Sequence, residues 1–390
     1  LGNKWAKLKV IHGPGPTITF AVGLADSDAT ATIASTAVVT ADSASVTADN
    51  LNSFTTSGSG DTYQPSPNFG LGITFTFSEY ESDAIATVDG TLTTDTGGVE
   101  VLADSVNELN LANAMARIRD EKKLSEKVAG KIGLSLMKST APVGDSGGSA
   151  FSMAGAVAVA FSTNYAEASI ASGAIVDAAG AVTVDALAED NARLRAVGVC
   201  DIASAVSMGG AVLYADYENE AQAFIGDGAD IDLAGDLDIT ATAKNPDPFR
   251  TDNDFADIWY GIKNFEAPAF PEVTGPADFF GDVSDYGSSL LANDLVSSGM
   301  GALAPFIENG DLFAPSRMAT THTAAVARAK SDKKGGGKSK LAVSGSANIF
   351  SYDNTAQAYI GEGVSVDFGA SNGNLNVAAE GTVETIHVGG

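Results

Sequence analysis

Asn354-Thr-Ala-Gln-Ala-Tyr-Ile-Gly-Glu-Gly363 is the stretch that decides the fold, because other parts of the chain repeat it. The clearest copies are Asn219-Glu-Ala-Gln-Ala-Phe-Ile-Gly-Asp-Gly228 and Asn164-Tyr-Ala-Glu-Ala-Ser-Ile-Ala-Ser-Gly173. Weaker copies are Asp28-Ala-Thr-Ala-Thr-Ile33 and Asp83-Ala-Ile-Ala-Thr-Val88. A repeat of this kind indicates stacked units, each of which buries its apolar side only against its neighbours.

Downstream of each copy, apolar and polar residues alternate. The apolar members stand two apart, as in Val182/Val184, Leu237/Ile239 and Leu375/Val377, and polar residues stand between them. This period of two predicts strands with an apolar inner side and an Asp, Thr and Asn outer side. Gly, Asn and Asp between the runs are typical of turns.

The repeat length bears on how the strands wind. The anchors Ile170 and Ile225 stand 55 residues apart. One coil of a tightly wound solenoid takes about 20 residues. We therefore expect two to three coils in each unit, within an all-β parallel β-helix, or solenoid.

The composition excludes several classes of protein. The 390 residues carry a net charge of −27, which disfavours nucleic acid and anionic membrane surfaces as partners. The hydrophobic fraction of 44% argues against a disordered chain. We expect the single cysteine, Cys200, to be a small core residue. The sequence shows no targeting signal, lipidation motif or transmembrane segment.

The repeat pattern and its interruptions suggest four regions. We expect an N-terminal lead-in over 1–17 and solenoid repeats over 18–244, interrupted by loops at about 50–70 and 138–150. An insertion rich in aromatic residues and proline follows over 245–318, with a short amphipathic helix between 285 and 307. The solenoid then continues over 319–390.

The insertion holds the candidate binding residues. Insertions in solenoids often lie on the binding side. Its aromatic residues have two interpretations, a small core of its own or a surface that contacts a partner subunit or a glycan. For the second interpretation the candidate residues are Trp259, Tyr260, Phe279 and Phe280.

Candidate chemistry is sparse. Asp227, Asp230 and Asp232 are weak Ca²⁺ candidates, since Ca²⁺ takes carboxylate and carbonyl oxygens. Their run does not match the calcium-binding nonapeptide, and solvated acidic turns would look the same. Gly144-Asp-Ser-Gly-Gly148 looks like a serine-protease motif, but a triad also needs a placed His and Asp. We predict no catalytic residues and no cofactor apart from possible Ca²⁺.

The repeat resembles the β-helical repeats of giant bacterial surface proteins and of filamentous haemagglutinin-like adhesins. The resemblance rests on Gly155-Ala-Val-Ala-Val, Gly210-Ala-Val-Leu-Tyr, the repeated Ala-Gln-Ala-Tyr/Phe-Ile motif and Gly235-Asp-Leu-Asp-Ile-Thr-Ala. It implies an exported, extended, right-handed parallel β-helix without a catalytic centre of its own, of the kind that forms stalks, fibres, sheaths or adhesins.

These features predict a non-catalytic structural or adhesive protein of the cell surface or extracellular space. Its expected partners are further copies of itself or more of a longer chain, and a glycan or cell surface in the adhesive case. The alternative is a carbohydrate-active β-helix enzyme, since β-helical polysaccharide lyases use clustered Asp with Arg or Lys. A glycan-binding adhesin is the other alternative.

Overall fold

The computed structural model describes residues 2–12, 16–63, 69–119, 149–201, 204–245, 320–327, 341–370, 373–383 and 386–389. These residues form a parallel β-solenoid built from three sheets, which confirms the predicted all-β class. The short helix predicted between 285 and 307 lies outside the described residues and stays a prediction. No helix long and apolar enough to cross a membrane occurs in the part of the chain that is described.

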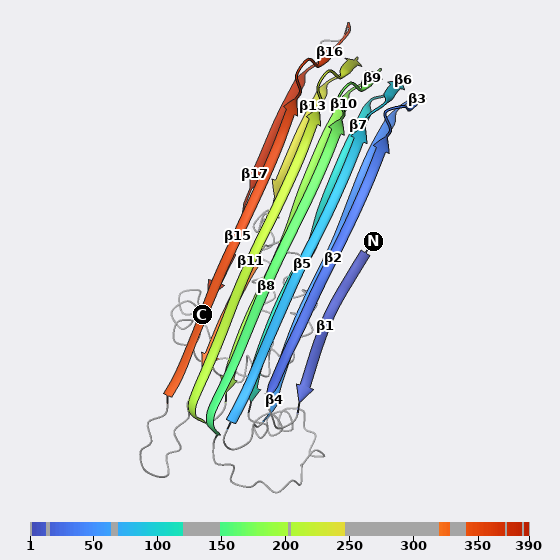
Figure 1. The fold of residues 1–390 in the computed structure, drawn as a ribbon. Coiled ribbons are helices and arrows are strands. Elements are labelled where there is room, and N and C mark those ends of the chain that lie inside the picture. The colour runs from blue at the N-terminus through green and yellow to red at the C-terminus, as the bar shows by residue number, and fades with distance from the viewer. Residues whose placement is uncertain are drawn as a thin grey trace, which may run out of the picture.

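Two of the three sheets contain the long strands, and the third consists only of strands of three or four residues (Figure 1). The leading sheet contains β2 (Thr17–Ile33), β5 (Phe69–Val88), β8 (Ser149–Ile170), β11 (Ser204–Ile225) and β15 (Leu341–Ile360). The tip sheet contains β3 (Val38–Ala41), β6 (Thr91–Thr94), β9 (Ile175–Ala178), β12 (Asp230–Leu233) and β16 (Ser365–Asp367). The return sheet contains β1 (Gly2–His12), β4 (Ala44–Tyr63), β7 (Val99–Arg119), β10 (Val182–Asp201), β13 (Leu237–Lys244), β14 (Thr320–Ala327), β17 (Leu375–Thr382) and β18 (Ile386–Gly389).

Each repeat unit makes one coil, so the expectation of two to three coils per unit is wrong. Ile170 pairs with Ile225, and Val182 pairs with Leu237, one unit further along the chain. A unit is used up in a single turn because its two long strands take about 20 residues each. We number the coils 1 (β2–β4), 2 (β5–β7), 3 (β8–β10), 4 (β11–β14) and 5 (β15–β18). In Figure 1 the colours cross the array from blue to red in this order.

The interior near the tip sheet follows the predicted alternation. Its inward residues are apolar, and the anchors Ile170 and Ile225 are fully buried there. Gly173, Gly228 and Gly363 have positive φ in the turns that lead to the tip strands. Glycine is favoured at these positions because a Cβ atom disfavours that backbone conformation.

Away from the tip, the interior differs from the predicted apolar inner side, because polar side chains also point inward there. In coil 2 the inward residues Thr74 and Thr76 are buried, whereas the large Phe75 and Phe77 point outward. Small inward residues allow the leading and return sheets to approach closely. A Cβ added at Gly198 would lie 2.1 Å from the backbone oxygen of Gly210, so the backbones at these two residues pack directly against each other.

Strands occupy two regions where the repeat pattern predicted none. β4 runs through to Tyr63, so most of the loop expected at about 50–70 is strand. Its Ser, Thr and Gly residues alternate between inside and outside as larger residues do in the other strands. Because few of them are apolar, the hydrophobic pattern of the sequence did not reveal this strand. The lead-in contains β1, which pairs with β4. The insertion separates β13 from β14, and both pair with the continuous β10.

Candidate functional site

A buried polar layer crosses the solenoid between two apolar clusters. One cluster lies beside the tip sheet, and the other lies further along the long strands. Between them, polar side chains from both long sheets point inward. The layer consists of Asn50, Asn52, Ser82, Ser105, Asn107, Asn110, Ser162, Asn164, Asp190, Asn219, Asn245 and Asn354.

Asparagines from successive coils connect within this layer. Asn219 Nδ2 donates to Asn354 Oδ1 at 2.8 Å, and Asn354 Nδ2 donates to Asn245 Oδ1 at 2.9 Å. Asn164 Nδ2 donates to the Ser105 carbonyl oxygen at 3.0 Å. Such ladders satisfy part of the hydrogen-bonding capacity of buried amides and hold neighbouring coils in register.

A bulge in β7 places two asparagines beside Asp190. β7 has one residue more than β10 between Asn107 and Asn110, so both asparagine side chains are inside and fully buried. Asn191 Nδ2 donates to the carbonyl oxygen of the bulge residue Glu108 at 2.9 Å. Bulges of this kind re-aim side chains, and here the bulge brings two amides to one carboxylate.

Asp190 is fully buried, and its two oxygens have different surroundings. Oδ2 accepts hydrogen bonds from Ser162 Oγ at 2.7 Å, Asn110 Nδ2 at 3.3 Å and Asn107 Nδ2 at 3.4 Å. Oδ1 has no hydrogen-bond partner among the described residues. Burial raises the pKa of Asp190 to about 7, although these three hydrogen bonds lower it and the nearby Glu189 raises it further.

Aromatic residues flank the carboxylate on the leading sheet. The inward positions of coils 2 to 5 at this level are Tyr80, Ser162, Tyr217 and Tyr352. Coil 3 therefore has a small side chain where its neighbours have tyrosine, and Ser162 is the residue that donates to Asp190. Burial and then the charge of Asp190 raise the pKa of Tyr217 and Tyr352 well above the usual value.

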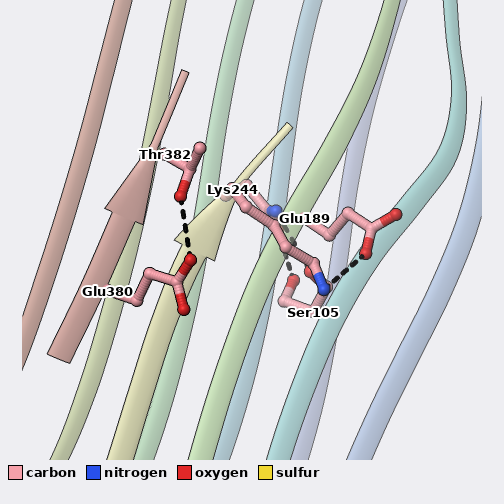
Figure 2. Close-up of polar contacts among 6 residues, drawn as sticks. Ser105, Glu189, Lys244, Glu380 and Thr382 are labelled. Carbon is pink, nitrogen blue, oxygen red and sulfur yellow. Dashed lines mark hydrogen bonds and ion pairs between the residues drawn. The ribbon is translucent and has the colours of Figure 1, made fainter. Parts of the chain in front are cut away.

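The return sheet also holds an ion pair beside the layer (Figure 2). Lys244 Nζ of β13 lies 3.5 Å from Glu189 Oε2 of β10. The pair involves the residue next to Asp190, not Asp190 itself. The Asp190 carboxylate is fully buried, and its hydrogen bonds join β10 to β7 and to β8.

Removing one rung of the ladder should be measurable. We expect Asn164→Ala to lower the free energy of unfolding by about 1–3 kcal/mol, because Ser105 loses a buried hydrogen-bond partner. Thr163→Ala, at the exposed neighbouring position, should change it by less than about 0.5 kcal/mol. Urea unfolding of both variants would check this, and equal effects would contradict the buried role of Asn164.

The acidic Ca²⁺ candidates lie at the tip. Asp227 Oδ1 accepts a hydrogen bond from the Glu362 backbone N–H at 2.7 Å, so this carboxylate joins the turns of coils 4 and 5. Asp230 and Asp232 point outward from β12. Partial desolvation and repulsion from neighbouring aspartates, Asp230, Asp367 and Asp177 in that order, raise the pKa of Asp232. Within the described ranges, no group of three or more His, Cys, Asp or Glu is arranged to hold a metal ion.

The other predicted site residues have mixed outcomes. Trp259, Tyr260, Phe279 and Phe280 lie outside the described residues, so their role stays a prediction. Cys200 is fully buried beside Ile118 and Ala154, as expected of a core residue.

The repeat pattern alone did not reveal the buried polar layer, although the sequence contains a signal for it. Asn164, Asn219 and Asn354 are the first residues of the three clearest copies of the repeat. Once each unit is known to form one coil, Asn107, Asp190 and Asn245 occupy equivalent positions in the return strands of coils 2, 3 and 4. Without that register, an inward polar residue cannot be told from an outward one.

The comparisons with known proteins give no further guide. No protein-family model matches the chain, and no curated protein or solved structure is significantly similar to it.

Proposed function

We propose that the protein is a non-catalytic structural or adhesive segment of an extracellular filament, stalk or sheath, in which coils stack lengthwise. The observation that carries the proposal is the open end of coil 5. Among the described residues no strand pairs with the outer edge of this coil, and residues of the core columns are exposed there. Such edges template the addition of further strands.

The exposure at coil 5 is clearest in the return sheet. Leu237 and Ile239 of coil 4 are fully buried, whereas Leu375 and Val377, their partners in coil 5, are 52% and 41% exposed. Because the same column of side chains is buried one coil earlier, a further coil on this end would bury them as well.

Coil 1 offers a matching surface. A neighbouring coil 5 placed on it in the register of the solenoid would set Ile360 over Ile33, Val366 over Val39 and Val377 over Val46. Inside the molecule, Ile33 lies against Val88 and Ile225 against Ile360 in the same way. In such a joint, the edge of β4 that would pair with β18 of the neighbouring molecule is already paired with β1 of the same chain.

The extracellular part of the proposal is supported by composition. A net charge of −27 with a single buried cysteine suits a protein that works in salt outside the cell. Immunogold labelling of intact, unpermeabilised producing cells tests it, and label found only after permeabilisation would overturn the extracellular assignment.

Lengthwise stacking predicts open-ended growth with concentration. Light scattering and electron microscopy of the purified chain should show particles that lengthen as concentration rises. We expect Val377→Lys to stop this growth, because a charge would be buried at the joint. Asn376→Lys adds the same charge at the neighbouring outward position and should leave growth unchanged. A chain that does not lengthen at any concentration, or growth that is insensitive to Val377→Lys, would overturn the proposal.

A further inference from the structure

The outer face of the leading sheet has an apolar surface where a soluble protein normally has polar residues. We define this outer patch as four outward rows across the five coils. Its large members are strongly exposed at its edge, with Ile18 at 54%, Phe20 at 61% and Val22 at 56%. The patch consists of Pro16, which directly precedes β2, with Ile18, Phe20 and Val22; Leu71, Ile73, Phe75 and Phe77; Met153, Gly155, Val157 and Val159; Met208, Gly210, Val212 and Tyr214; and Val343, Gly345, Ala347 and Ile349.

The patch carries no charged residue, although the chain is strongly acidic. Acidic residues begin in the adjacent rows, with Glu79 and Asp216 and then Asp26, Glu81, Glu218 and Asp353. Five strands about 4.8 Å apart and four rows about 6.7 Å apart give roughly 600 Å². Two such faces bury about 1,200 Å², the lower end of the range for specific interfaces. An uncharged centre that is bordered on one side by charged rows also fits the usual anatomy of an interface, an apolar centre beside a polar rim.

The shape of the patch identifies the partner. One row reads Ile18, Ile73, Gly155, Gly210 and Gly345 from coil 1 to coil 5. Its first two residues form a ridge. Its three glycines form a groove, because a Cβ added at any of them would meet nothing within 4 Å.

The next row has the same gradient from large to small. It reads Phe20, Phe75, Val157, Val212 and Ala347. These are the middle two of the four rows. Because their bulk lies at the coil 1 end and their space at the coil 5 end, they complement the same rows of a copy that is turned end for end.

We infer that two copies of this chain pair face to face through the outer patch, about a two-fold axis that runs along β8. This axis keeps each row at its level and reverses the order of the coils. It places Ile18 over Gly345, Ile73 over Gly210 and Phe20 over Ala347. Because the interface is isologous, each contact occurs twice and the assembly closes as a dimer.

This inference deepens the proposed function, since it adds lateral pairing to lengthwise stacking. The two are separable in experiment. Stacking gives open-ended growth, whereas pairing gives a closed dimer. The Val377→Lys chain, in which stacking is blocked, should still sediment as a dimer if the outer patch pairs.

The decisive variant fills the groove. In the Val377→Lys background, Gly210→Val should weaken dimerisation about ten-fold or more, because Ile73 of the second copy no longer fits. The fold should tolerate Gly210→Val, since the position is outward, open and extended and valine favours strands. Circular dichroism and melting temperature check that point.

A compensating variant excludes a merely structural explanation. Ile73→Ala removes the ridge and should also weaken the dimer. Ile73→Ala combined with Gly210→Val should restore pairing, because the larger side chain at position 210 of one copy then faces the smaller one at position 73 of the other. Raising the salt concentration should tighten the dimer, since the acidic rims face each other. A monomer at all concentrations, binding only to another protein or to lipid vesicles, or the absence of rescue in the double variant would each overturn the inference.

Discussion

Gly198→Ala is expected to destabilise the solenoid by about 3 kcal/mol or more, although it adds a single methyl group. The added Cβ would lie 2.1 Å from the Gly210 backbone oxygen and 3.1 Å from that of Ala154. Neither atom is the end of a flexible side chain, so relief requires a whole strand to move. β10 and β11 would have to separate, and their stacked neighbours would separate with them.

The measurement is the urea midpoint and the melting temperature, with hydrogen exchange to locate the change in β10 and β11. Gly155→Ala is the matched control, because its Cβ would meet nothing within 4 Å. We expect this control to be neutral or to stabilise by up to about 1 kcal/mol through the lower entropy of the unfolded chain. A Gly198→Ala chain that melts like the native protein would show that the sheets are further apart than described.

Asp190→Asn is expected to stabilise the protein at pH 8 and to remove part of its pH dependence. The folded pKa of about 7 lies above the ordinary value of about 3.9. Below about pH 4, Asp190 is protonated in both the folded and the unfolded state, so its ionisation does not lower the free energy of unfolding. The cost develops as pH rises from about 4 to 7 and is complete above 7, at about 4 kcal/mol as an upper limit.

Asparagine suits the position because neighbouring coils already use it. Asn107 and Asn245 hold the equivalent places in coils 2 and 4. Asn107 Oδ1 and Asn110 Oδ1 have no hydrogen-bond partner among the described residues, so an added amide N–H offers a donor where acceptors are unpaired. A proton on the native Asp190 would do the same at low pH.

The readout is the difference in unfolding free energy between the native and Asp190→Asn chains from pH 4 to pH 8. We expect this difference to grow toward pH 8. Burial also raises the pKa of Asp83 and Asp104, but their contributions are the same in both chains and cancel. Asp95→Asn, at an exposed turn, should leave the profile unchanged. A variant less stable than the native chain at pH 8 would show that the carboxylate has a favourable role.

The sequence predicted the parallel solenoid well and the winding of its coils poorly. The copies that begin at Asn164, Asn219 and Asn354 locate the repeat, and the structure pairs them directly. Their 55-residue spacing does not itself say how many coils it contains. Strand length depends on where Ser-, Thr- and Gly-rich stretches remain extended, as in β4 up to Tyr63, and such residues give little hydrophobic pattern.

The sequence by itself determined the fold class, the apolar core beside the tip and the burial of Cys200, because a strand with alternating apolar residues buries one side wherever it lies. Only the tertiary structure decided the single-coil register, the convergence of Asn107, Asn110 and Ser162 on Asp190, and the ridge and groove of the outer patch. These features depend on which residues of different coils become neighbours. A one-residue bulge in β7 changes those neighbours, and the chain order alone does not reveal it.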